Sequence, residues 1–476
     1  MFEKKVVRLI ILIFALISVI VFLIWFLYNP VDHLSVSLPG LDNRPPRTAD
    51  TAAVVIGEKF NYYATEETNL KGKWPNFRGP DYDNINKEKI PLIDKFPKGG
   101  PKVMWSVDLG EGHAAPAIYN GKVFVLDYNE IKKADALRCF SLKTGTELWK
   151  RWYNVHVKRN HGMSRTIPAV NDKYVVTIGP NCQVMCTGVD SGNFVWGIDL
   201  VKEYDTEVPF WHTGQCPLID SNRAIIATGG KALLIAVDLK TGKVVWETPN
   251  PEAWKMSHSS IVPITYKNKK MYVYASLGGV FGVSAYGSDA GKVLWQLKEF
   301  APSVIAPSPV YLGDGRIFIT AGYGEGGTLF QISGNGNNYT AKVLQKYLPK
   351  DGVCSEQQTP ILYKGYMFAI LPKDAGGNRN QLVACKPNDT KNILFTAGKD
   401  VRFGLGPYIV ADDKFYIVDD DGTLTIAKFN GTAINVLDKY RVIEGQDAWG
   451  PIAIADGRLI MRDSKKMVCL DIRKNN

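Results

Sequence analysis

Hydrophobic and polar positions alternate in short runs along most of this chain, from Trp74 to the C-terminus. Runs of β-branched and aromatic residues are separated by Gly, Asn and Asp turns, and no long stretch shows the 3.6-residue period of an amphipathic helix. The pattern therefore predicts an all-β fold built from many short strands.

A repeat organises these short strands. Each unit opens with a proline, which is followed by an apolar run, a polar turn and a second apolar run. The spacing between successive units is about 48 residues, within the range of propeller blades. The aligned prolines are Pro116, Pro168, Pro217, Pro263, Pro309, Pro360, Pro407 and Pro451.

A second motif closes each unit with a small residue, an Asp-x-x-Thr-Gly turn and a tryptophan. Its best copy runs from Ala236 to Trp246, and other copies are Cys139–Trp149, Cys186–Trp196 and Ala285–Trp295. The glycine allows the positive φ of a tight hairpin, and the tryptophan offers a large apolar area for docking between sheets. Four strands in each of eight units predict an eight-bladed β-propeller of four-stranded blades.

The last unit lacks its fourth strand, because the chain ends soon after its third strand at 467–472. A matching strand precedes the first unit at 102–109 and carries Trp105 where a docking tryptophan belongs. We expect residues 102–109 to complete the last blade and so remove its open edge. The predicted blade-docking residues are Trp105, Trp149, Trp196, Trp246 and Trp295.

These repeat copies resemble the quinoprotein-like family of eight-bladed propellers, whose units are called PQQ repeats after pyrroloquinoline quinone. Trp74-Pro-Asn-Phe-Arg-Gly-Pro80 is similar to the opening segment of bacterial PQQ-like repeat proteins, and the resemblance covers about residues 74–476. The family includes PQQ dehydrogenases and the non-enzymatic propeller lipoprotein of the β-barrel assembly machinery. The repeats therefore indicate the fold and leave the function to be read from a site.

Two features of the PQQ dehydrogenases are missing here. Those enzymes typically hold two adjacent cysteines above the quinone, and no two of the seven cysteines are adjacent. They also bind Ca²⁺, which needs six to eight oxygen ligands, and no such set can be assembled from this sequence. We therefore predict no cofactor, and PQQ with Ca²⁺ is disfavoured.

The N-terminus carries an apolar stretch over residues 6–28, interrupted only by Arg8 and Ser18. It is long enough to cross a bilayer, and the lysines before it place the C-terminal bulk outside the cytoplasm. A cleaved signal peptide is the alternative. We expect a cytoplasmic stub and single-pass signal-anchor in the inner membrane at 1–28, a juxtamembrane linker with a short helix near 51–63 at 29–73, and the propeller at 74–476, in the periplasm or outside the cell.

Charge and cysteine placement narrow the function classes. The net charge of +10 is spread along the chain without a run of like charge, so no nucleic-acid partner is expected. Four cysteines occupy the small-residue position of the repeat and are expected to be buried. A disulfide of Cys182 stays open. The four repeat cysteines are Cys139, Cys186, Cys385 and Cys469, while Cys182, Cys216 and Cys354 lie nearer to loops.

Polar and aromatic residues gather in the loops before the aligned prolines. These loops enter the first strand of each unit, so we expect them to meet at one mouth of the central channel. Five of the six histidines fall there, including His156 and His161. The predicted ligand site at this mouth comprises His113, Arg165, His212, Gln215, His258, Glu356, Gln357, Arg402, Asp447 and Trp449.

No catalytic or metal-ligating set emerges from the sequence. There is no G-x-S-x-G elbow, and the glycine cluster 322–327 leads into a strand and not into the helix that a dinucleotide site needs. We expect a membrane-anchored, extracytoplasmic scaffold that binds an envelope protein or a small ligand at the channel mouth. The alternatives are a PQQ-dependent alcohol or sugar oxidoreductase and a lyase or hydrolase of envelope glycans.

Overall fold

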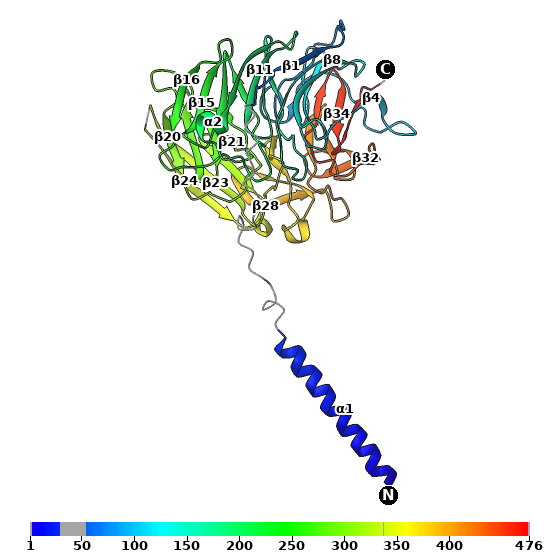
Figure 1. The fold of residues 1–476 in the computed structure, drawn as a ribbon. Coiled ribbons are helices and arrows are strands. Elements are labelled where there is room, and N and C mark those ends of the chain that lie inside the picture. The colour runs from blue at the N-terminus through cyan, green and yellow to red at the C-terminus, as the bar shows by residue number, and fades with distance from the viewer. Residues whose placement is uncertain (1, 29–53, 337, 475–476) are drawn as a thin grey trace. The chain divides into compact units, whose positions relative to one another are not determined.

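The computed structural model describes residues 2–28, 54–336 and 338–474, which form two compact units, Met1–Ala53 and Val54–Asn476 (Figure 1). The first unit contains the helix α1 (Phe2–Leu27). Its residues Lys4–Leu27 are long and apolar enough to cross a membrane, which fits a membrane anchor and equally a signal sequence.

The second unit is an eight-bladed β-propeller, as the sequence predicts. Each blade is an antiparallel sheet that contains four strands in meander order. The first strands are β5 (Ala117–Tyr119), β9 (Ala169–Val170), β13 (Leu218–Asp220), β17 (Val262–Tyr266), β21 (Val310–Gly313), β25 (Ile361–Tyr363), β29 (Tyr408–Ala411) and β33 (Ala453–Ala455). The second strands are β6 (Lys122–Asn129), β10 (Tyr174–Ile178), β14 (Arg223–Ala227), β18 (Lys269–Ser276), β22 (Arg316–Ala321), β26 (Tyr366–Ile370), β30 (Lys414–Val418) and β34 (Arg458–Arg462).

The third and fourth strands complete each blade towards the outside. The third strands are β7 (Ala134–Ser141), β11 (Gln183–Gly188), β15 (Ala232–Asp238), β19 (Gly279–Ser284), β23 (Gly326–Asn335), β27 (Leu382–Lys386), β31 (Thr423–Phe429) and β35 (Lys466–Asp471). The fourth strands are β8 (Glu147–Asn154), β12 (Phe194–Asp199), β16 (Val244–Pro249), β20 (Val293–Leu297), β24 (Asn338–Tyr347), β28 (Asp389–Thr396), β32 (Ile434–Arg441) and β4 (Lys102–Asp108).

The first strands of most neighbouring blades contact one another, so the first strands lie around the central axis. Each aligned proline lies at or just before the start of a first strand. The loops before these prolines therefore converge at one end of the axis. The short helix α2 (Leu200–Tyr204) and the 3-10 turns η2 (Pro349–Asp351) and η3 (Gly376–Asn378) interrupt the connections.

The ring closes as the sequence predicts. The strand β4 pairs antiparallel with β35 and places Trp105 opposite Cys469. The indole Nε1 of Trp105 donates to the Leu142 carbonyl in the first blade at 3.0 Å. Both ends of the propeller chain thus meet in the eighth blade, where β4 covers the outer edge of β35.

The repeat tryptophans sit between neighbouring blades. A Cβ on the turn glycine of one blade would lie only 2.6–3.0 Å from the tryptophan of the preceding blade. Trp295 instead packs beside Phe330 of the next blade, with ring centroids 5.6 Å apart. The turn glycine therefore also makes room for the neighbouring indole. The glycine pairs are Gly145 with Trp105, Gly192 with Trp149, Gly242 with Trp196, and Gly291 with Trp246.

Residues 54–73, which the sequence analysis places in the linker, belong to the propeller unit. The short helix expected near 51–63 is wrong in its described part, because β1 (Lys59–Tyr62) is a strand that pairs with β8. The outer edge of β8 offers unpaired backbone groups, and β1 forms hydrogen bonds with them. The Phe60 ring also packs against the Trp149 ring, with ring centroids 6.4 Å apart. Residues 29–53 lie outside the described part of the chain.

The next part of the N-terminal region enters the channel. The strand β2 (Lys73–Trp74) pairs with β5 in the first blade, and β3 (Ile85–Asn86) pairs in parallel with β29 in the seventh. Between them the chain contacts several more blades through backbone carbonyls, as when Arg78 donates to Pro360 at 3.2 Å. We call residues 73–86 the channel segment, because it occupies the axis where the first strands lie.

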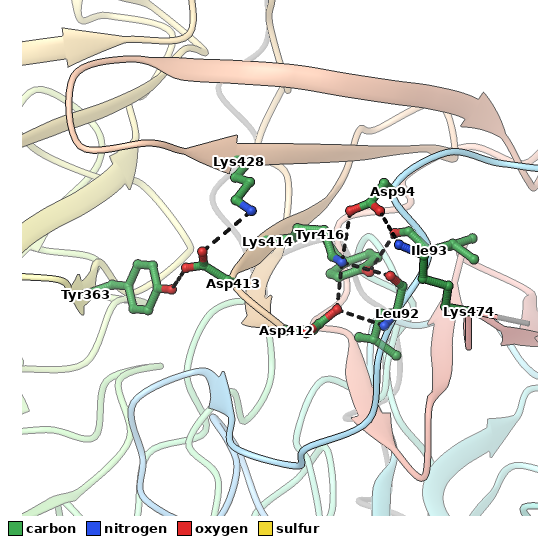
Figure 2. A network of polar contacts seen from close by, with 10 residues as sticks. All are labelled: Leu92, Ile93, Asp94, Tyr363, Asp412, Asp413, Lys414, Tyr416, Lys428 and Lys474. Carbon is green, nitrogen blue, oxygen red and sulfur yellow. Dashed lines mark hydrogen bonds and ion pairs between the residues drawn. The ribbon is translucent and has the colours of Figure 1, made fainter. Parts of the chain in front are cut away.

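A strap from Lys87 to Pro101 then returns to the outside and is held by a polar network on blade seven (Figure 2). The Nζ of Lys414 donates to the Leu92 carbonyl at 2.8 Å and contacts Asp412 at 2.7 Å and Asp94 at 3.2 Å. The Lys414 side chain is only 5% exposed. Lys474 also pairs with Asp94 at 3.0 Å, so the strap and the C-terminus are joined to one blade.

All seven cysteines are free and buried, which excludes in this structure the disulfide left open for Cys182. Burial raises the pKa of each thiol, for example to about 11 for Cys216. Buried thiols of this kind pack as small apolar side chains.

Candidate functional site

The loops before the first strands surround a cavity of about 380 Å³ at one end of the axis. Its volume lies in the range of small-ligand pockets. Each blade contributes at least one lining residue, so the cavity depends on the whole ring. We call it the axial cavity and define it by His113, Arg165, Trp211, His258, Val304, Glu356, Leu405 and Trp449, one from each entering loop, with Phe77 from the channel segment.

Phe77 lies in the part of the channel segment that reaches this cavity. The channel segment is pinned at several points of the ring, including Trp74 against β5 and Asn84, whose Nδ2 donates to the Tyr408 carbonyl at 2.9 Å. The N-terminal region therefore supplies a wall that the repeats alone do not provide.

A chain of hydrogen bonds holds five consecutive entering loops in place. The Ile167 amide donates to the Cys216 sulfur at 3.3 Å, and the Cys216 amide donates to the Ser260 hydroxyl at 3.0 Å. The Ser260 amide donates to Ser308 Oγ at 3.1 Å, and the Ser308 amide donates to Thr359 Oγ1 at 2.9 Å. Small polar side chains at this position thus link blade to blade and fix the cavity wall.

Two aromatic groups line the cavity. Trp211 and Tyr323 are stacked with ring centroids 5.9 Å apart and planes at 13°. On the other side, His113 stacks on Trp449 with centroids 3.6 Å apart and planes at 17°. Gln358 donates to the Trp449 carbonyl at 3.2 Å and so orients that loop. Flat faces on both sides suit a ligand with an apolar or planar body.

Two of the cavity histidines, His113 and His258, are neutral at physiological pH. Burial lowers the pKa of His113 to about 2 and that of His258 to about 4, and the nearby Arg165 guanidinium adds to both shifts. Neutral imidazoles offer one donor and one acceptor each. They are therefore hydrogen-bonding groups here and carry no positive charge.

Charge in the cavity is divided between two sides. Arg165 lies in the loop that enters the second blade. Glu356 lies in the loop that enters the sixth blade, which is opposite the second in a ring of eight. Asp420 and Asp447, from blades seven and eight, join the acidic side. Burial raises the pKa of Glu356, and burial together with the Asp447 and Asp421 carboxylates raises that of Asp420.

The structure brings together seven of the ten sequence-predicted site residues. The other three lie outside the cavity lining. The amide of Gln215 is used by the Ala227 backbone, at 3.0 and 2.6 Å. His212 is buried beside the cavity, and Arg402 donates to the Arg379 carbonyl. Those in the lining are His113, Arg165, His258, Glu356, Gln357, Asp447 and Trp449.

Several lining residues were missed by sequence reasoning. Tyr323 belongs to the glycine cluster 322–327, which forms the hairpin between β22 and β23 and extends over the cavity edge. Asp420 lies in the corresponding hairpin of blade seven. The hairpins that join the second and third strands lie at the same end of the axis as the entering loops. An aromatic or acidic residue in such a hairpin could therefore have been predicted from the sequence to line the cavity. Phe77 had no comparable signal.

PQQ with Ca²⁺ fits this residue set poorly. Among the residues that the structure describes, no group of three or more His, Cys, Asp or Glu is arranged to hold a metal ion. Ca²⁺ requires six to eight oxygen ligands, and the carboxylates of Glu356, Asp420 and Asp447 do not form such a ligand group. The seven cysteines include no adjacent pair.

Part of the sequence is similar to a quinohemoprotein dehydrogenase. It is 27% identical over 182 residues to the quinohemoprotein alcohol dehydrogenase ADH IIB of Pseudomonas putida, a match that covers 36% of this chain and 24% of that relative. The chain thus spans about a quarter of that relative's length. Its substrate and activity do not transfer with so partial a match.

Solved structures share the fold at low sequence identity. BamB from Moraxella catarrhalis matches with a TM-score of 0.51 at 12% identity, covering 79% of this chain and 99% of BamB. Quinohemoprotein alcohol dehydrogenase from Comamonas testosteroni matches with a TM-score of 0.57 at 12% identity, covering 85% and 81%. These likenesses show the propeller and carry no function.

The family assignment rests on sequence. The family profile described as outer membrane protein assembly factor BamB matches residues 132–427, which is more than half of the chain. The match extends from the first blade into the seventh. The chain therefore belongs to the family of the outer membrane protein assembly factor BamB.

Proposed function

We propose that this protein is a membrane-anchored, extracytoplasmic propeller that binds an envelope protein or a small ligand at its axial cavity. One observation carries the proposal: loops from all eight blades converge on a cavity that offers aromatic faces, neutral histidines and separated charges. Such a lining supplies recognition, and no nucleophile with an activating base stands out in it.

The N-terminal helix supports the location. Lys4, Lys5 and Arg8 lie at its start, and the positive-inside rule keeps this end in the cytoplasm. The propeller would then lie on the far side of the inner membrane. The name of the family agrees with a role in the envelope.

Photocrosslinking in intact cells tests the proposal. A photoreactive residue replaces Tyr323, which is 57% exposed at the cavity edge, and in a control it replaces Val245, which is 52% exposed on the outer strand β16. We expect a discrete adduct from position 323 that weakens when Trp449→Ala removes the stacked wall. The same adducts from both positions, or none from position 323, would contradict a binding role for this end.

The second candidate function is a PQQ-dependent alcohol or sugar oxidoreductase, which the similarity to the Pseudomonas putida dehydrogenase favours. Titration of the purified chain with PQQ and Ca²⁺, followed by dye reduction with alcohols and sugars, separates the two functions. We expect neither saturable PQQ binding nor dye reduction. Both together would replace the binding role with catalysis.

A further inference from the structure

Arg165 is a cation without an acidic partner. Its Nη2 donates only to the backbone carbonyls of 160, 161 and 162, the shortest at 2.6 Å, and its Nε is buried with no partner. Within the described parts of the chain, no carboxylate lies within 4.0 Å of it. Burial lowers its pKa to about 10, so it stays charged at neutral pH. The Arg165 side chain is partly exposed at the cavity, and a bound oxyanion would supply the counter-charge that the described residues do not.

The acidic side of the cavity is also unpaired. Glu356, Asp420 and Asp447 form no ion pair with a lysine or arginine in the part of the chain that the structure describes. Asp420 accepts one hydrogen bond, from the Leu405 amide at 3.0 Å. Glu356 is only 8% exposed. The Lys373 ammonium group acts on Glu356 from beyond ion-pair distance, so the neighbouring carboxylates still favour a cationic group that hydrogen-bonds to them.

The two charged sides are separated by an uncharged middle. Tyr323 lies within electrostatic reach of both, because Glu356 raises the pKa of its hydroxyl and Arg165 lowers it. His258 and His113 are neutral, and the Trp211–Tyr323 stack provides a flat face. A ligand spanning the cavity therefore meets a cation, then aromatic surface, then carboxylates.

From this arrangement we propose that the axial cavity binds a zwitterionic amino-acid or short-peptide ligand, with its carboxylate on Arg165 and its ammonium group against Glu356, Asp420 and Asp447. The ligand body lies between the aromatic faces. This inference rests on the proposed function, since it assigns a ligand class to the same cavity. A polyanion is disfavoured because three carboxylates face its second charge, and a plain cation leaves Arg165 unpaired.

Calorimetry on the purified chain with the tripeptide Ala-Phe-Ala tests the proposal. Its N-acetylated form lacks the ammonium group, and its C-amidated form lacks the carboxylate. We expect the free tripeptide to bind saturably and each blocked form to bind at least about tenfold more weakly, which corresponds to about 1.4 kcal/mol. Blocked forms that bind as tightly as the free tripeptide would overturn the proposal, and so would the absence of saturable binding.

Double-mutant-type cycles, which combine a protein substitution with a blocked end of the tripeptide, assign each ligand charge to its protein partner. In Arg165→Gln we expect C-amidation to lose its effect while N-acetylation keeps it, and in Glu356→Gln/Asp447→Asn we expect the reverse. Arg402→Gln is the matched control, because this guanidinium lies outside the cavity lining, and it should leave all three affinities unchanged. Equal effects of both blocks in every variant would overturn the assignment of the two ends.

The two proposals fail in distinguishable ways. A discrete adduct at position 323 together with no tripeptide binding would overturn the ligand class alone. Binding of an acidic oligosaccharide that is sensitive to Arg165→Gln and insensitive to Glu356→Gln/Asp447→Asn would also overturn the zwitterion. The absence of both an adduct at position 323 and tripeptide binding would overturn the binding role as well as the ligand class.

Discussion

Replacing Trp105 with alanine is expected to lower the free energy of unfolding of the propeller by about 3–5 kcal/mol, the usual cost of truncating a buried tryptophan. Trp105 is 7% exposed, lies on β4 opposite Cys469, and donates its indole N–H to the Leu142 carbonyl. The substitution leaves a cavity at the seam between the eighth and first blades and an unpaired carbonyl there. Urea unfolding of the purified chain measures the change.

Trp246→Ala is the matched control for this prediction. Trp246 holds the same place in its blade, opposite Ala236, but it is half-buried and its Nε1 has no partner among the described residues. We expect it to cost about 1–2 kcal/mol, since less apolar area is lost. If both substitutions cost the same, the closure at β4 would have no special role in stability.

Gly79→Ala is expected to destabilise the propeller by about 2–4 kcal/mol through the channel segment. Gly79 has a φ of +78°, which a residue with a side chain adopts at a cost of about 1–2 kcal/mol. A Cβ there would also lie 2.6 Å from the Trp74 ring, so the indole that pairs the segment with β5 must move. Thermal unfolding and urea midpoints measure the loss.

Gly99→Ala separates backbone strain from the steric clash. Gly99 has a φ of +94°, and a Cβ at this position would meet nothing within 4 Å. We therefore expect only the backbone cost, about 1–2 kcal/mol. A Gly79→Ala variant no less stable than Gly99→Ala would show that the channel segment is not packed tightly on the ring.

The repeat made the propeller predictable. A blade uses local hairpins, so its prolines, turn glycines and tryptophans recur at a fixed spacing that one sequence displays. The closure by 102–109 followed from counting strands, because an unmatched fourth strand needed a partner. Both features depend on short-range pattern and on the number of units.

The N-terminal region could not be predicted in the same way. The strand β1 and the channel segment have no repeat, and their contacts join residues far apart in the sequence, such as Asn86 with Ile454. A short helix near 51–63 was expected from local composition, but the segment pairs with the free edge of β8 and forms the strand β1. Tertiary pairing overrides weak local preference here.

The candidate site was predicted in part for a related reason. Entering loops are marked by the prolines, so His113, Arg165 and Trp449 could be placed at the cavity from sequence order. Whether a side chain turns inward depends on packing, and the Gln215 amide turns to the Ala227 backbone instead. Residues supplied by hairpins and by the channel segment need the three-dimensional ring to be seen.

The central claim, that an envelope component occupies the axial cavity, is tested most directly by thiol labelling. All seven native cysteines are buried, but Cys216 also lines the cavity, so both variants carry Cys216→Ser. Ala306→Cys then places the reactive thiol in the cavity wall, and Ala301→Cys in the same loop is the exposed control. A small methanethiosulfonate reagent is applied to the purified chain and to intact envelopes. We predict that Cys labelling at 306 is slower in envelopes than in the purified chain while labelling at 301 changes little; an equal ratio at both positions would contradict the account.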